Sequence, residues 1–169
     1  MDAHALWFTG PKVSSINCFA FVAQPVDCPI DVVFVLDESG SIGWPNFDLM
    51  KSFLSQLVSR LDIDSGQTRV GLVTFASGVG THFNLNAHST VAAVQSAIAS
   101  LGYAGGTTNT HLALAYVRTT MLISAAGDRP DVPNVVVVLT DGQSTDTLLT
   151  VVSIQVQIAN LNLNLKLSS

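Results

Sequence analysis

The sequence has few charged residues and no clustered basic ones. Charged side chains make up 11% of the 169 residues, and the formal net charge is −5. Globular domains usually carry about 25% charged residues. The lack of a basic patch argues against nucleic-acid binding. Hydrophobic residues make up 48% of the chain, so either much of it is buried or its surface carries unusually few charges. Its length fits one domain with a sizeable core.

Long apolar runs and a targeting signal are also lacking. No uninterrupted apolar stretch approaches the ~18 residues of a membrane-spanning helix. The first 16 residues do not have the basic and apolar regions of a secretory signal peptide. The only cysteines are Cys18 and Cys28. They could pair with each other, Cys28 could pair outside this chain, or both could be free thiols, so they leave the redox compartment open.

Apolar periodicity predicts strands that alternate with helices. Trp44 and Phe47 are expected to pack the start of the first predicted helix. Its apolar residues have the i, i+3, i+4 spacing of an amphipathic helix: Met50, Phe53, Leu54, Leu57, Val58 and Leu61. Ser89 or Thr90 is expected to cap the second helix. The predicted strands span residues 31–36, 69–76, 80–85 and 134–140, and the predicted helices span residues 45–61, 91–101 and 111–123.

This alternation predicts a three-layer α/β fold. Its sheet is doubly wound and mostly parallel, with helices on both faces and residues 80–85 as one antiparallel edge strand. Residues 1–29 show no clear period and are interpreted as an N-terminal leader or linker, with a short strand conceivable at 19–23. Residues 30–169 form the predicted domain. Within it, residues 148–159 could form a helix, and residues 161–167 alternate like a strand.

Oxygen-bearing side chains follow the predicted elements at one edge of the sheet. The carboxyl ends of parallel strands open on the same edge, which is where open α/β sheets bind ligands. Carboxylates and hydroxyls are the ligands of hard cations such as Mg²⁺, Mn²⁺ and Ca²⁺. The candidate ligands are Asp37, Ser39 and Ser41 after the first strand, Thr107 or Thr108 in a glycine-rich loop, and Asp141 after the last central strand.

Plainer readings of these residues compete with a cation site. Ser and Asp favour turns and helix caps for local reasons, so the segment 37–41 by itself could be a turn. A nucleophilic Ser39 would need a Gly-x-Ser-x-Gly elbow, which is absent, and Asp37 as a phosphoryl acceptor is disfavoured because Ser39 stands where a second aspartate is usual. Three histidines lie in separate segments without close spacing, which favours surface or helix-start roles over zinc: His82, His88 and His111.

Three segments in order resemble a known motif. They look like the metal-ion-dependent adhesion site (MIDAS) of von Willebrand factor type A domains. Flanking segments at 68–73, 83–85, 134–139 and 141–144 also resemble the extracellular branch of that family, which includes matrilins, collagens and integrin I domains. The resemblance covers about residues 31–147. The motif segments are Asp37-Glu38-Ser39-Gly40-Ser41, Gly105-Gly106-Thr107-Thr108-Asn109-Thr110 and Thr140-Asp141-Gly142.

The resemblance implies Mg²⁺ or Mn²⁺ at this site, with Ca²⁺ a poorer fit. In the family two serines bind the ion directly, a threonine joins directly or through water, and the aspartates act mostly through water. In the family, the threonine ligand stands six residues before an apolar residue in the first turns of the next helix. Leu114 fits that apolar residue, so the resemblance selects Thr108 over Thr107. Glu38 matches the family but is expected to point away from the metal. The implied metal residues are therefore Asp37, Ser39, Ser41, Thr108 and Asp141.

The C-terminal part departs from the family pattern. The family continues with a last strand and a final helix, which are missing here, so we expect an incomplete domain: a fragment, a truncated isoform or the product of an imperfect gene model. In integrin-type members the final helix couples the geometry of the metal site to ligand affinity. Its absence puts such switching in doubt for this chain.

The sequence therefore favours a non-enzymatic, cation-dependent adhesion module of a secreted or cell-surface protein. Its partner would be a protein, such as an extracellular matrix component, that presents a Glu or Asp carboxylate to the metal. Three other functions stay open: a matrix assembly module with an incidental metal site, an intracellular scaffold domain, and, ranked last, a metal-dependent hydrolase.

Overall fold

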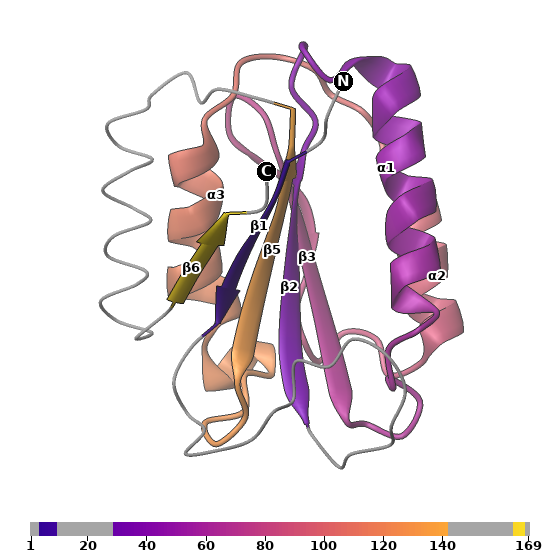
Figure 1. The fold of residues 1–169 in the computed structure, drawn as a ribbon, viewed down its shortest axis with the longest axis vertical. Helices are drawn as coiled ribbons and strands as arrows, with labels where there is room; N and C mark the ends of the chain where they lie inside the picture. Colours follow the sequence, from indigo (N-terminus) through magenta and orange to yellow (C-terminus); the bar gives the residue numbers. More distant parts are fainter. Residues whose placement is uncertain (1–3, 10–28, 142–163, 168–169) are drawn as a thin grey trace.

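A single mixed sheet organises the chain. The computed structural model describes residues 4–9, 29–141 and 164–167. Within these residues, six strands pair in the order β4-β3-β2-β5-β1-β6 (Figure 1). The strands are β1 His4–Thr9, β2 Ile30–Asp37, β3 Thr68–Phe75, β4 Val79–Phe83, β5 Asn134–Thr140 and β6 Asn164–Leu167.

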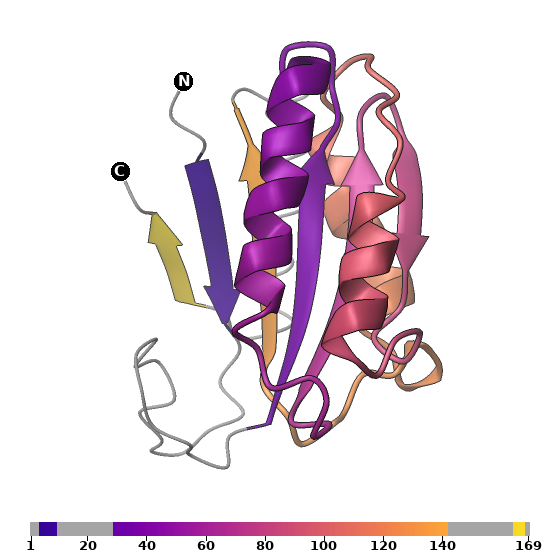
Figure 2. The ribbon, with the colours of Figure 1, turned by 90° about the vertical axis from the view of Figure 1, so that its right-hand side faces the viewer.

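The centre of the sheet is parallel and buried. β2 pairs in parallel with both β3 and β5, and all seven residues of β5 are buried. A strand that is apolar on both sides needs cover on both faces of the sheet. The helices α1 (Gly43–Val58) and α2 (Val91–Ala99) lie side by side on one face, and α3 (Thr110–Tyr116) covers the other (Figures 1 and 2). This arrangement confirms the predicted fold class.

Alternate residues of β2 supply two separate cores. Phe34 and Leu36 pack with Leu54 of α1 in the cluster under α1 and α2. Val33 and Val35 belong to the cluster on the α3 side. This period of two is the normal side-chain alternation of a strand. Packing on both faces fixes the position of β2 in the sheet. The carboxyl end of β2 therefore positions the residues that follow it.

The third helix changes its winding after two turns. The sequence predicts a helix over 111–123, but the α-helix ends at Tyr116, and Val117–Met121 forms a π-helical turn closed by Leu122 N–H donating to Val117 O at 2.9 Å. The Thr119 hydroxyl donates to the Ala115 carbonyl at 2.9 Å. Such side-chain bonds to the preceding turn compete with regular helix bonding. A 3₁₀ turn at Ser124–Ala126 follows.

Strand β1 lies within residues 1–29, the segment interpreted as a leader or linker. His4–Thr9 is an interior strand that pairs antiparallel with β5 on one side, with Ala5 opposite Leu139, and antiparallel with β6 on the other. It adds a second antiparallel strand to the expected edge strand β4. The domain boundary at residue 29 itself stays a prediction. β6 confirms the strand-like end of 161–167, whereas the strand at 19–23, the helix at 148–159, both cysteines and the expected C-terminal incompleteness fall outside the described residues.

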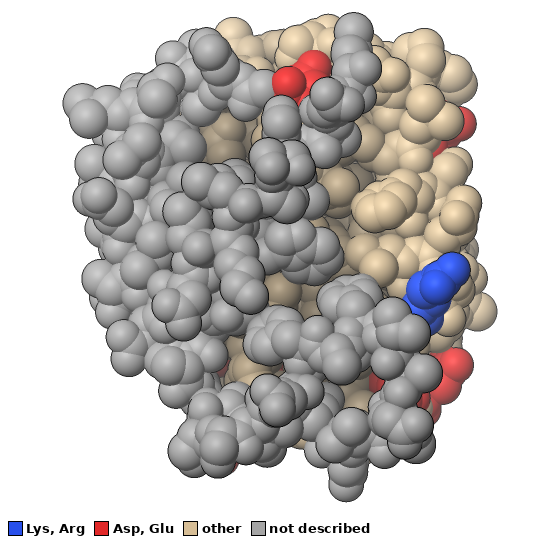
Figure 3. Space-filling model, in the orientation of Figure 1, with Lys and Arg blue, Asp and Glu red and all other residues tan. Residues whose placement is uncertain are grey.

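Helix α1 differs from expectation in two side chains. Phe47 is buried as predicted, but Trp44 is 62% exposed, and Phe53, assigned to the apolar face, is 52% exposed. Few charged groups appear on the described surface seen in Figure 3, as the composition requires. No helix in the described ranges is both long and apolar enough to cross a membrane.

Candidate metal centre

Asp37 ends β2 and is held from two sides. Its side chain is fully buried. One oxygen, Oδ1, accepts the Ser39 N–H at 2.8 Å, and the other, Oδ2, accepts the Thr140 hydroxyl at 2.6 Å. These bonds tie the loop after β2 to the end of β5. The orientation of the Asp37 carboxylate is therefore fixed by the strands that flank it.

The two serines connect this loop to the second aspartate. Ser39 Oγ lies 3.2 Å from Ser41 Oγ, and the Ser41 hydroxyl donates to Asp141 Oδ1 at 3.1 Å. Ser41 and Asp141 are 100 positions apart in the chain. The structure thus brings four of the five predicted metal residues into one hydrogen-bonded group at the carboxyl edge of the sheet.

A glycine-rich loop lies against this group. The Gly40 N–H donates to Gly106 O at 2.8 Å, and the Gly105 N–H donates to Glu38 O at 3.0 Å. Gly106 has a φ of +112°, and a Cβ on it would overlap Ser77 Oγ. Only glycine adopts such a backbone without strain, so the loop's path depends on this residue type.

The two threonines of the glycine-rich loop have different surroundings. Thr107 donates both its N–H and its hydroxyl to Ser77 Oγ, each at 3.0 Å. Thr108 is 8% exposed. The assignment of Thr108 rather than Thr107 as the metal residue stays a prediction.

The donor set suits a hard divalent cation. In an octahedron, Mg²⁺ bonds of about 2.0–2.1 Å place neighbouring oxygens about 2.8–3.0 Å apart, and Ca²⁺ bonds of about 2.3–2.6 Å place them about 3.3–3.7 Å apart. The separations in the serine–aspartate group, 3.1 and 3.2 Å, lie between these ranges. The spacing therefore does not select between the two cations, and the suitability for a hard cation rests on the oxygen donors themselves. In the described part of the chain, no three His, Cys, Asp or Glu residues gather as alternative ligands.

Tyr103 supports the site, although the sequence reading did not single it out for this role. Its hydroxyl donates to the backbone carbonyl of Ser39 at 2.9 Å, and its ring lies 5.7 Å from that of Phe47. Tyr103 precedes the glycine loop, so it links that loop, α1 and the serine segment. Its place next to the glycine-rich stretch is the only local signal that could have pointed to it.

Glu38 faces a different neighbourhood from the serines. Its Oε1 accepts the Thr74 hydroxyl of β3 at 3.0 Å, in line with the expectation that it points away from the metal. Burial raises the pKa of the Glu38 carboxyl, and the Asp37 charge adds to the rise, while hydrogen bonds from Thr74 and from the Ala104 backbone oppose it.

No histidine takes part in the hydrogen bonds described for Asp37, Ser39, Ser41 and Asp141. The ring of His82 lies 4.9 Å from that of Tyr116, and the ring of His88 lies 4.9 Å from that of Phe83. His111 is in the first turn of α3.

An open α/β sheet with helices on both faces and an oxygen-lined site at its carboxyl edge defines a class of doubly wound ligand-binding domains. The chain belongs to the von Willebrand factor type A domain family, which it matches over residues 31–164.

Several relatives are similar to this chain over most of this region. Collagen alpha-4(VI) chain of Mus musculus is 42% identical over 120 residues, which are 70% of this chain and 5% of the collagen chain. Matrilin-1 of Bos taurus is 41% identical over 123 residues, which are 71% of this chain and 23% of matrilin-1. The chain therefore spans well under two thirds of the length of these relatives.

Solved structures agree with this family. Crystal form 2 of proximal thread matrix protein 1 from the mussel byssus superposes with a TM-score of 0.75 and 28% identity, over 82% of this chain and 37% of that chain. A structure of the same mussel protein described as having a zinc-occupied MIDAS motif gives a TM-score of 0.73 and 26% identity, over 82% of this chain and 37% of that chain.

Proposed function

We propose that this chain is a protein-binding module that depends on a divalent cation held at the carboxyl edge of its sheet. The observation that carries this proposal is the hydrogen-bonded group of Asp37, Ser39, Ser41 and Asp141, which joins the ends of β2 and β5. Thr108 completes the proposed set from the glycine loop. The mussel relative with a zinc-occupied MIDAS motif supports the same assignment.

The residue types explain why such a site would bind a partner. The serine and threonine hydroxyls carry no charge, so they neutralise little of the charge of a cation. When bound, Mg²⁺ or Mn²⁺ supplies a Lewis acid that can accept a further carboxylate oxygen. The buried Asp37 carboxylate orients the Ser39 backbone, and Asp141 orients the Ser41 hydroxyl. The partner would therefore offer a Glu or Asp side chain.

The relatives support a location and a role for the parent protein. Collagen chains and matrilin-1 are extracellular matrix proteins, so we infer a secreted module that engages a matrix protein without enzymatic turnover. A role in matrix assembly that leaves the metal site unused is the alternative. The two differ in what loss of the cation does: chelation with EDTA abolishes partner binding in the first case and leaves assembly intact in the second.

The metal itself is tested by calorimetric titration of the chelator-treated protein with Mg²⁺, Mn²⁺ and Ca²⁺. Ser41→Ala is the preferred variant, because Asp37 is fully buried and its loss would also remove the acceptor of the Ser39 N–H and of the Thr140 hydroxyl. We expect Ser41→Ala to weaken cation binding at least tenfold. The matched control is Ser96→Ala on the exposed side of α2, which should bind like the wild type. Equal affinities for all three proteins would contradict the proposed site.

Acceptance of a carboxylate is tested with acetate as the probe. Mn²⁺ held by the protein should speed the relaxation of acetate protons beyond the effect of the same amount of free Mn²⁺. Ser41→Ala should remove this enhancement at Mn²⁺ levels that saturate the wild type. An enhancement that is identical in Ser41→Ala would mean that acetate meets the ion elsewhere.

A further inference from the structure

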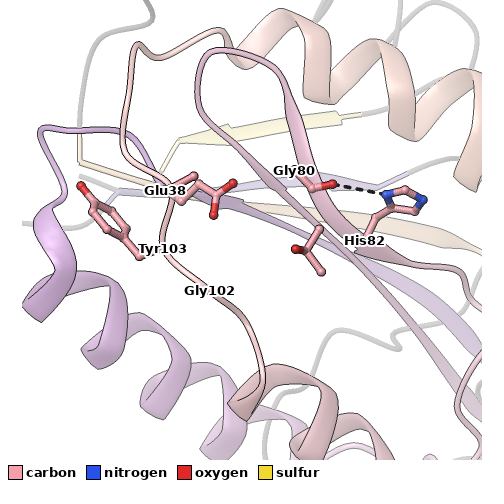
Figure 4. A pocket seen from close by; sticks show the side chains of 7 residues that line it. Glu38, Gly80, His82, Gly102 and Tyr103 are labelled. Carbon is pink, nitrogen blue, oxygen red and sulfur yellow. Dashed lines mark hydrogen bonds between the residues drawn. The ribbon is translucent and has the colours of Figure 1, made fainter.

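A second recess opens beside the metal centre. Its volume is about 520 Å³, and it lies between the edge strand β4 and the loop that joins α2 to the glycine-rich stretch (Figure 4). Figure 4 shows the Glu38 side chain between these two walls, directed away from Tyr103 and towards the hairpin that carries Gly80. The cleft is lined by Glu38, Gly80, Thr81, His82, Gly102, Tyr103 and Ala104.

Glu38 is the acidic group of this cleft, and in the described part of the chain no Lys or Arg nitrogen forms an ion pair with it. The residue is 5% exposed. Its carboxylate accepts bonds from the Thr74 hydroxyl and the Ala104 backbone. An ionised carboxylate has about four acceptor positions, so these two bonds leave it capacity for further donors.

The edge strand β4 approaches this carboxylate closely. A Cβ on Gly80 would overlap both Glu38 Oε1 and Thr74 Oγ1. Glycine at this position lets β4 approach the carboxylate without displacing it. On the opposite wall, Tyr103 offers a ring against which the methylene stem of a long side chain can pack, while its hydroxyl stays bonded to Ser39 O.

We propose that this cleft binds the ammonium or guanidinium group of a Lys or Arg on the same protein partner whose carboxylate reaches the metal centre. The inference rests on the proposed function for the identity of that partner. A buried carboxylate without a counter-charge is costly, and an incoming cation offsets that cost. An anionic or purely apolar group would leave it unpaired. Planar guanidinium would match the carboxylate better than ammonium.

The position of Glu38 links the two sites. It stands between Asp37 and Ser39, and consecutive Cα atoms are about 3.8 Å apart. The metal centre and the cleft are thus neighbouring recesses on either side of one short loop. A partner would satisfy both with an acidic and a basic side chain close together on its surface. The second contact would add specificity that a lone carboxylate on a metal does not supply.

The cleft is tested first without a metal or a partner. The probe is n-butylguanidinium, titrated into ¹⁵N-labelled protein at pH 7.5 in EDTA. We expect saturable shifts of the Gly80, Gly102 and Ala104 amides. Glu38→Gln should weaken this binding at least tenfold, and Asp48→Asn, which removes an exposed acid from α1, should not. Thr81→Lys is a second variant that places a competing ammonium at the cleft, and it should also block the probe.

Shifts that are centred elsewhere, or that survive unchanged in both Glu38→Gln and Thr81→Lys, would overturn the assignment of the cleft. The two variants act in different ways, one by removing the charge and one by occupying the space. A folding defect in one of them therefore leaves the other as the test, with the amide spectrum reporting the fold.

Two-point recognition is tested with a pair of short peptides in Mg²⁺. One carries a Glu and an Arg two residues apart, and the other carries norleucine in place of Arg. We expect the Arg peptide to bind the wild type at least fivefold tighter, and the difference to vanish in Glu38→Gln. Equal binding of both peptides overturns the cleft inference and leaves the proposed function intact. If neither peptide binds in an Mg²⁺-dependent way, the proposed function is contradicted. The butylguanidinium titration then still decides whether the cleft binds cations.

Discussion

At the scale of single residues, the path of the glycine-rich loop beside the metal centre depends on Gly106. Gly106→Ala adds a Cβ that meets Ser77 Oγ on a backbone with φ of +112°. We expect a loss of about 1–3 kcal/mol in the free energy of unfolding, from backbone strain together with overlap. We also expect weaker Mg²⁺ binding, because the loop that carries Thr108 must move. Chemical denaturation and calorimetric titration measure the two effects.

Gly66→Ala is the control for this substitution. Gly66 also has a positive φ, +81°, but a Cβ there meets nothing within 4 Å. It should lower stability through strain alone and leave Mg²⁺ affinity unchanged. If both variants lost Mg²⁺ affinity to the same extent, the close approach to Ser77 would not be the cause.

A second residue-scale prediction concerns the ion pair at the opposite edge of the sheet. The Asp31 side chain is fully buried, and Arg129 donates to its Oδ1 from Nη2 at 2.7 Å and from Nε at 2.9 Å. Arg129→Ala leaves that buried carboxylate without its charged partner, which typically lowers the free energy of unfolding by about 3–5 kcal/mol. Urea denaturation should show this loss. Arg60→Ala, at an exposed position, should stay within about 0.5 kcal/mol of wild type.

The double variant Asp31→Asn with Arg129→Ala separates two causes of that loss. If the cost comes from an unpaired buried charge, removing the charge as well should recover part of the stability. The Arg129 guanidinium also donates to the Gly66, Ile30 and Gln67 carbonyls. Recovery should therefore be incomplete, and no recovery at all would assign the whole effect to these carbonyl bonds.

The candidate site was predictable from sequence where its residues directly follow strands. Asp37 and Asp141 stand at the ends of recognisable apolar runs, so the parallel sheet alone brings them to one edge. The sequence did not predict that Tyr103 would bond to Ser39 or that Arg129 would pair with Asp31. Each acts on a carbonyl or carboxylate that is distant in sequence, and no local pattern reports such a contact.

At the scale of elements, the start of α2 gives a clean test of a local interaction. The Thr90 side chain accepts the Ala93 N–H at 3.2 Å, which selects Thr90 over Ser89 as the cap. Thr90→Ala should lower the free energy of unfolding by about 1 kcal/mol. Thermal and urea denaturation measure it. Ser89→Ala is the neighbouring control and should be close to neutral, and the reverse order would contradict this assignment.

Elements with one dominant signal were predicted within a residue or two. β2 and β5 are nearly continuous apolar runs, which is the pattern of a strand buried on both faces. The errors arose where tertiary context decides. The periodicity of α1 assigned Phe53 to the core, but the neighbouring elements leave it 52% exposed. The end of α3 unwinds into a π turn that no periodicity indicates.

At the scale of the whole molecule, β1 is the element that the sequence could not indicate. Its six residues pair with β5, about 130 positions further along the chain, and with β6 beyond that. A strand of this length carries little information of its own, and its place is set by an edge that only the folded sheet offers. The register Trp7 opposite Val137 makes β5 an interior strand.

Removing residues 1–9 tests this placement. Without β1, the backbone N–H and C=O groups along one side of β5 lose their partners, and β6 loses its connection to the sheet. An apolar strand with a free edge is a template for pairing between chains. We therefore expect the shortened protein to melt at a lower temperature and to associate, as seen by light scattering after size-exclusion chromatography. A control lacking only residues 1–3 keeps the whole strand and should behave like the full chain. A shortened protein that stayed monomeric with an unchanged melting temperature would mean that β1 does not protect this edge in solution.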